Sequence, residues 1–101
     1  MFGDMMGKLQ EMKQKVEETK QRLETITVVG ESGDGSVKVI VNGNKKVVNV
    51  SVNEDVLKGD KEEVEDLLLI AVNRALEQSE KVYEAEMQGA TKGFLPNLPG
   101  M

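Results

Sequence analysis

The clearest pattern in the chain is a heptad-like spacing of apolar residues toward its N-terminal end. Seven positions follow one another at alternating intervals of four and three residues: Met5, Leu9, Met12, Val16, Thr19, Leu23 and Ile26. Such spacing is typical of a helix that packs one seam against another helix. It predicts a helix over residues 4–25, which would be about 33 Å long and would project from so small a domain.

Beyond this helix the pattern changes to runs of β-branched residues separated by turn residues. Gly33-Asp34-Gly35 separates the first two runs and Asn42-Gly43-Asn44 separates the next two. Asn and Gly tolerate the positive φ of tight hairpins, so these segments predict an antiparallel meander of three strands within residues 26–52. The three predicted strands cover residues 26–29, 37–41 and 47–52.

A second long helix is predicted over residues 61–88. Asp60 is its expected N-cap, and Glu63 follows three residues later, as in an acidic version of the capping box. Acidic residues crowd the first turn, where the helix dipole favours negative charge. The connector at residues 53–59 has room for one helical turn.

These elements predict one α+β domain over residues 1–101, with a long helix, a three-stranded antiparallel meander and a second long helix (α-β-β-β-α). The last nine residues include Gly93, Pro96, Pro99 and Gly100, which interrupt regular structure. Residues 93–101 are therefore expected to form a flexible tail.

The second predicted helix contains an unbroken apolar run, Leu67–Val72, that surrounds more than a full turn. A three-stranded sheet covers one side of a helix, and burying each large side chain is worth about 1.5 to 3 kcal/mol. The run therefore predicts a homodimer whose two-fold interface is formed by Leu67, Leu68, Leu69, Ile70 and Val72. The alternative is a helix that a single monomer encloses.

The composition excludes several kinds of chemistry. The chain has no Cys and no His, which removes disulfides, thiol nucleophiles, thiolate zinc sites and imidazole catalysis. The Gly-rich segment 30–35 joins two strands and lacks the lysine of a phosphate-binding loop. We therefore expect no enzyme activity, no cofactor and no small-molecule substrate. No stretch approaches the about 18 apolar residues of a membrane span, and no basic leader is present, so we expect a cytoplasmic protein without a membrane partner.

The net charge of −5 is unevenly distributed, because the acidity belongs almost entirely to the C-terminal half of the chain. In the first helix the bases flank the apolar seam. With Leu9 at heptad position a, three bases fall at g and two at e: Lys8, Lys15, Arg22, Lys13 and Lys20. Two interpretations remain open. These bases could pair with acids of the second helix, namely Glu77, Glu80, Glu84 and Glu86, which the pattern alone favours. Alternatively, they could face phosphates together with Lys81, Lys45 and Lys46.

Several short motifs carry a resemblance to a known family, the YbaB/EbfC family of bacterial nucleoid-associated proteins. They are Met1-Phe2-Gly3, the Gly30-Glu31-Ser32-Gly33-Asp34-Gly35 turn after Val29, Val37-Lys38-Val39, Asn42-Gly43, Glu65-Asp66-Leu67 and Leu98-Pro99-Gly100. The resemblance covers essentially the whole chain. It implies a tweezer-like homodimer located in the nucleoid, which binds double-stranded DNA, alters its conformation and influences gene expression.

The resemblance also indicates which residues would contact DNA, because basic residues of the two long helices are implied. In this sequence they are Lys8, Lys13, Lys15, Lys20, Arg22 and Lys81. Their chemistry predicts phosphate and shape contacts with limited sequence preference. The alternative function is a dimeric protein-interaction adaptor that does not bind DNA directly, which the methionines of the first helix, Met5, Met6 and Met12, would suit.

Overall fold

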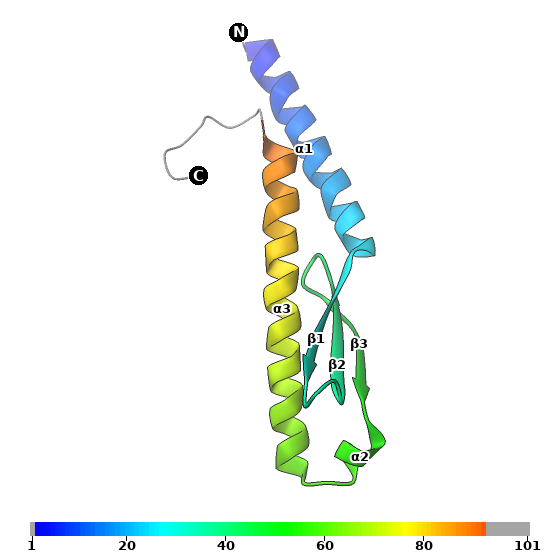
Figure 1. The fold of residues 1–101 in the computed structure, drawn as a ribbon. Helices are drawn as coiled ribbons and strands as arrows, with labels where there is room; N and C mark the ends of the chain where they lie inside the picture. Colours follow the sequence, from blue (N-terminus) through cyan, green and yellow to red (C-terminus); the bar gives the residue numbers. More distant parts are fainter. Residues whose placement is uncertain (1, 93–101) are drawn as a thin grey trace, which may run out of the picture.

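The structure, a computed structural model, describes residues 2–92 and has the predicted α-β-β-β-α order with one extra turn of helix (Figure 1). The elements are α1 (Phe2–Thr25), β1 (Thr27–Ser32), β2 (Val37–Asn42), β3 (Val47–Val52), α2 (Glu54–Leu57) and α3 (Lys61–Thr91). The short helix α2 lies in the connector where one turn was predicted. The tail expected at residues 93–101 lies outside the described residues.

The three strands form an antiparallel sheet in the order β1-β2-β3, as the meander predicts. In its register, Val39 on β2 lies opposite Gly30 on β1 and Val50 on β3. The turn between β1 and β2 has positive φ at Gly33 (59°), at Asp34 and at Gly35 (88°), which explains the glycines there. A register shift at residues 40–41 interrupts the pairing of β2 with β3.

The core is thin and lies between the sheet and α3. Val37, Val39 and Val41 point from β2 toward α3, where Ala71 and Ala75 face them, and all five side chains are fully buried. The alanines are small enough to let the helix approach the sheet closely. In Figure 1 α3 runs beside the whole length of the sheet.

Gly30 lies where α3 approaches β1 most closely. A Cβ at this position would lie 2.2 Å from the Ala71 carbonyl oxygen and 2.4 Å from the Ala75 nitrogen. Two residues later, the Ser32 hydroxyl donates a 2.6 Å hydrogen bond to the Leu67 carbonyl. The Gly30–Gly35 motif therefore has a structural role, because it joins β1 to α3.

The turn at residues 43–46 fixes the root of α1. The Gly43 N–H donates to the carbonyls of Leu23 (2.9 Å) and Ile26 (2.8 Å), and a Cβ at Gly43 would lie 2.6 Å from Leu23 Cδ2. The Ser79 hydroxyl of α3 donates to the Asn42 carbonyl at 2.6 Å. This corner thus connects both long helices to the sheet.

Three details of the predicted elements are wrong. Strand β1 continues to Ser32 and does not end at residue 29, because Gly30, Glu31 and Ser32 pair with β2. The positive φ in the second turn falls on Lys45 (φ 67°), so close approach and not φ explains Gly43. Helix α3 starts after the predicted N-cap Asp60, whose side chain accepts from the Glu62 N–H, but it continues to Thr91 instead of ending at residue 88. Ala90 packs in a buried position, which holds the last turn in helical form.

Candidate nucleic-acid interface

The apolar seam of α1 is covered along only part of its length. Helix α3 runs antiparallel to α1 and covers Thr19 and Leu23, which are buried. Toward the N-terminus the cover is lost, and Leu9 and Met5 are 56% and 64% exposed. Figure 1 shows α1 continuing past the end of α3 as a separate projection. We refer to residues 4–14 as the arm; its length is about 16 Å at the standard rise.

The bases of α1 form two rows, one on each side of the seam. The first row contains Lys8, Lys15 and Arg22, and the second contains Lys13 and Lys20. Members of a row are seven residues apart, which places them about 10 Å apart along the helix. All five residues are exposed.

The first row borders a cleft between α1 and α3 of about 510 Å³. The cleft is lined by Lys15, Glu18, Thr19, Arg22, Ala85, Glu86, Gly89 and Ala90. The Arg22 Nη2 atom lies 2.6 Å from the Glu86 Oε2 atom, so the two helices are joined by an ion pair. Pairing of seam bases with acids of the second helix, which the pattern favoured, is confirmed for Arg22.

The other acids predicted to pair with α1 are placed differently. Within residues 2–92, Glu77, Glu80 and Glu84 make no ion pair with α1. All three are exposed, because their positions on α3 turn away from the helix face that carries buried Ala71, Ala75 and Ser79. Among residues 2–92, Lys8, Lys13 and Lys20 therefore form no ion pair with an α3 carboxylate.

The second row of bases lies beside the turn at residues 43–46. The Asn44 side-chain amide donates to the Lys20 backbone carbonyl at 2.9 Å, which fixes this turn against α1. The Lys45 ammonium lies 4.2 Å from the centre of the Tyr83 ring on α3, within range of a cation–π interaction. The structure thus brings Lys20 and Lys45 to the same corner, although 25 positions separate them in the sequence.

An acidic residue of α1 is held in the same corner. The Glu24 Oε1 atom accepts from the Asn44 amide at 2.9 Å, and its Oε2 atom accepts from the Asn42 amide at 3.2 Å. Both oxygens are therefore directed at neutral donors of the turn. Lys13 and Lys20 form no ion pair in the part of the chain that the structure describes.

Lys81 lies on α3 on the side of the first row. It precedes the cleft residue Ala85 by four positions, and residues four apart share a helix face. Arg74, seven positions before Lys81, continues this face and donates from Nη1 to the Glu31 carbonyl at 2.8 Å. The sequence analysis did not single out Arg74, which here joins α3 to β1.

The Leu67–Val72 run is only partly covered by its own chain. Leu67, Leu68 and Val72 are half-buried, whereas Leu69 and Ile70 are 61% and 41% exposed. Leu68 and Val72 pack against the core. One subunit therefore leaves part of this run uncovered.

Two other kinds of site are absent from residues 2–92. No group of three or more acidic residues in this part of the chain could hold a metal ion. None of the described helices combines the length and the apolar character needed to cross a membrane.

Comparison with known proteins gives a consistent result. A model of the YbaB/EbfC DNA-binding family matches residues 1–94. A nucleoid-associated protein of Flavobacterium johnsoniae is 40% identical over 97 residues, which are 96% of this chain and 91% of the relative. A nucleoid-associated protein of Caldanaerobacter subterraneus is 39% identical over 101 residues, with 99% and 89% coverage. The crystal structure of an uncharacterized Helicobacter pylori protein superposes with a TM-score of 0.79 at 25% identity, covering 84% of this chain and 90% of that one.

Proposed function

Since the chain belongs to the YbaB/EbfC DNA-binding family, we propose that it is a nucleoid-associated protein that binds double-stranded DNA as a homodimer. Binding uses mainly phosphate and shape contacts. It alters DNA conformation, and through this it influences nucleoid organisation and gene expression. The protein acts in the nucleoid as a binding protein, without catalysis, cofactor or small-molecule substrate.

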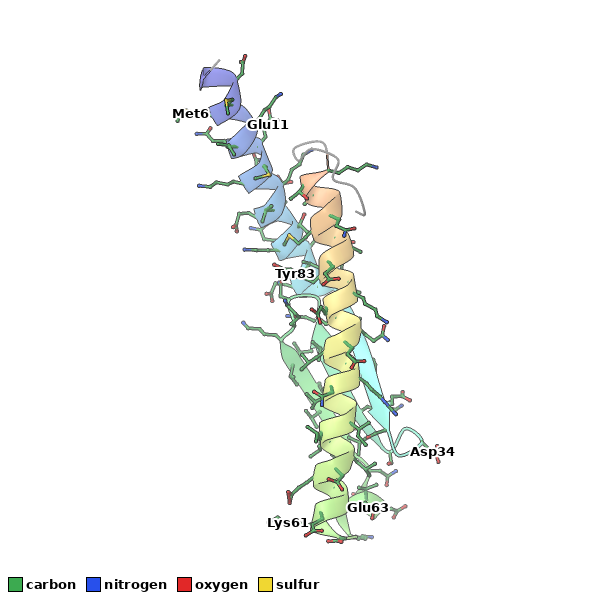
Figure 2. The ribbon with its side chains drawn as sticks, turned by 90° about the vertical axis from the view of Figure 1, so that its left-hand side faces the viewer. Met6, Glu11, Asp34, Lys61, Glu63 and Tyr83 are labelled. Carbon is green, nitrogen blue, oxygen red and sulfur yellow. The ribbon has the colours of Figure 1, made fainter. Side chains whose placement is uncertain are left out.

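The observation that carries the proposal is the pair of basic rows on a helix that projects from the body. Figure 2 places Met6 and Glu11 on α1 at one end of the molecule and Lys61 and Glu63 at the other. The molecule is 67 Å long, and its acidic helix start lies at the far end from the arm. Charges separated by more than about 8 Å are largely screened at physiological salt, so the acidic end hardly weakens phosphate binding at the arm.

The basic residue types on α1 favour backbone recognition over base recognition. Lys8, Lys13, Lys15 and Lys20 carry flexible point charges that suit phosphate oxygens. Base edges are usually read by a helix or strand with several amide or arginine side chains that enter a groove. On this chain Arg22 is paired with Glu86, which leaves lysines as the principal contacts and predicts limited sequence preference.

The homodimer is supported by a sheet face that α3 does not cover. The register places Val50 opposite Val39 and Val47 opposite Val41, so these β3 valines point to the same side as the buried β2 valines. Helix α3 packs on β1 and β2 and leaves β3 largely uncovered, so Val47 and Val50 are each 47% exposed. An apolar face of this kind is suited to a second copy.

The neighbouring flank of α3 extends this apolar face. Leu69 lies three positions before Val72 and therefore on its side of the helix. Leu67 and Ile70 lie on the other flank, because Leu67 is beside Gly33 of the first turn and Ile70 precedes Arg74, which bonds to β1, by four positions. The proposed two-fold interface thus contains Leu69 and Val72, with the β3 valines in place of Leu67 and Ile70. Leu68, also predicted for the interface, packs against the core of its own chain.

A salt titration tests the DNA-binding proposal. Each phosphate that the protein neutralises contributes a slope of about −0.9 to the plot of log affinity against log salt. We expect duplex DNA to be bound at low salt with a slope equivalent to several contacts. A flat salt response would contradict DNA binding. Retention of a protein partner from nuclease-treated lysate, without any shift of duplex DNA, would instead support the adaptor function.

A further inference from the structure

Two lysines, Lys45 and Lys46, lie on the turn that joins β2 to β3, beside the root of α1. Both are exposed, and neither forms an ion pair within residues 2–92. The turn is fixed against α1, because the Asn44 amide donates to the Lys20 carbonyl at 2.9 Å. The two lysines therefore add positive charge next to Lys20, which belongs to the second row. We refer to Lys20, Lys45 and Lys46 as the basic corner.

The backbone of Lys45 has a conformation that lysine seldom adopts. Its φ is 67°, in the left-handed region that Gly and Asn tolerate best. Gly43 and Asn44 precede it in the same turn, yet neither of them has a positive φ. The turn thus has a lysine at the position where asparagine or glycine would cost less strain. A residue kept in this conformation in an exposed turn indicates a function for its side chain.

The Tyr83 ring on α3 fixes the position of that side chain. The Lys45 Nζ atom lies 4.2 Å from the centre of the ring, and Tyr83 itself is half-buried. Figure 2 shows Tyr83 at the level where α1 meets the sheet. A lysine ammonium has three N–H donors, so contact with one ring face leaves donors for another acceptor. Tyr83 therefore holds the charge at the basic corner without neutralising it.

The acid that contacts this turn does not neutralise the lysines either. Both oxygens of Glu24 accept from neutral amides, Oε1 from Asn44 at 2.9 Å and Oε2 from Asn42 at 3.2 Å. Among the described residues Glu24 forms no ion pair with a lysine of the basic corner. The corner therefore keeps three ammonium groups that an external anion can reach.

Resting on the DNA-binding function proposed above, we propose that Lys45 and Lys46 bind DNA phosphates and that Tyr83 positions Lys45 for this contact. Lys13 and Lys20 lie about 10 Å apart along α1, and the turn continues their row toward the sheet. Each strand of duplex DNA carries a phosphate about every 3.4 Å along the helix axis, so a strand that follows the row meets successive lysines. The DNA-binding surface thus extends from α1 onto the body of the domain.

Fluorescence anisotropy with a labelled duplex of mixed sequence, titrated at several salt concentrations, tests the proposal on the full chain. Lys45→Asn removes the charge and keeps a residue that tolerates the positive φ. We expect the salt slope of binding to fall by about 0.9 in this variant, and by the same amount in Lys46→Gln. Lys58→Asn is the matched control, because the C-cap of α2 lies at the opposite end of the sheet. Circular dichroism shows whether each variant is folded.

The positioning role of Tyr83 needs a separate comparison. Tyr83→Leu removes the ring face, and we expect DNA affinity to fall about 2- to 5-fold. Tyr83→Phe retains the ring and should bind as the wild type does. In the Lys45→Asn background, Tyr83→Leu should cause no further loss, because Tyr83 acts through Lys45. The same loss in both backgrounds would contradict the positioning role.

Two outcomes would overturn the extension of the DNA-binding surface while DNA binding itself stands. One is wild-type binding with an unchanged salt slope in both Lys45→Asn and Lys46→Gln. The other is an equal loss in Lys58→Asn, because the effect would then follow net charge. If the wild type binds no duplex DNA at low salt, the proposed function fails, and this inference fails with it.

Discussion

The Arg22 guanidinium on α1 lies 2.6 Å from the Glu86 carboxylate on α3, and this ion pair joins the two long helices across their cleft. The two side chains are 55% and 34% exposed, so solvent screens the pair and its contribution to stability is at most about 1 kcal/mol. Its larger effect is on charge, because Glu86 competes with any phosphate for Arg22.

Replacement of Glu86 by Gln should therefore strengthen DNA binding. Arg22 becomes available for a phosphate, and we expect the salt slope of binding to become steeper by about 0.9. The matched control is Glu80→Gln, which removes the same charge from α3 at a position without an ion pair among the described residues. If the two variants gain the same affinity for DNA, the change in net charge explains the gain and the release of Arg22 does not.

Single replacements of the lysines on α1 should each remove one contact. For Lys13→Gln or Lys20→Gln we expect weaker binding on all DNA sequences, with the salt slope reduced by about 0.9. Lys61→Gln carries the same charge change at the opposite end of the molecule and serves as the control. A comparable loss in the Lys61 variant would contradict the assignment of DNA binding to α1.

The proposed dimer interface can be tested by two neighbouring residues on opposite flanks of α3. Leu69→Glu places a charge in the proposed interface, and we expect sedimentation to show the mass of a monomer. Ile70→Glu places the same charge on the other flank and should leave the dimer intact. Both side chains are exposed in the single chain, so neither change should unfold it. Dimers that dissociate only in the Ile70 variant would locate the interface on the opposite flank.

Gly30→Ala should destabilise the fold strongly. Its Cβ would lie 2.2 Å from the Ala71 carbonyl oxygen, and neither that backbone nor β1 can move without separating α3 from the sheet. We expect a loss of about 3 kcal/mol or more in the free energy of unfolding, measured by denaturant titration. Gly89→Ala is the control, because nothing lies within 4 Å of its Cβ position. The free energy of unfolding of the control should rise by up to about 1 kcal/mol, because alanine has the better helix propensity. A small loss of stability in the Gly30→Ala variant would contradict the close contact between α3 and β1.

Local patterns were sufficient to predict most of the elements. The heptad spacing predicted α1, the Gly33 turn predicted the first hairpin, and Asp60 predicted the start of α3. Each depends on residues that are neighbours in the chain, so helix periodicity, φ preference and capping can be recognised in the sequence. The basic rows flanking the seam follow from the same periodicity, and so does the apolar character of the run at residues 67–72.

The tertiary structure decided which residues far apart in the chain meet. Arg22 pairs with Glu86 and not with the other candidate acids. The close approach of Leu23 explains the glycine at position 43, whereas the sequence predicted a positive φ there. Among the described residues, α3 ends before the arm and leaves it uncovered, and the register of β3 exposes the valines that suit a second copy. These outcomes depend on the angle and depth at which the helices pack on the sheet. The sequence therefore determined the elements and the charge along α1, whereas packing determined which of those charges and apolar side chains remain available to a partner.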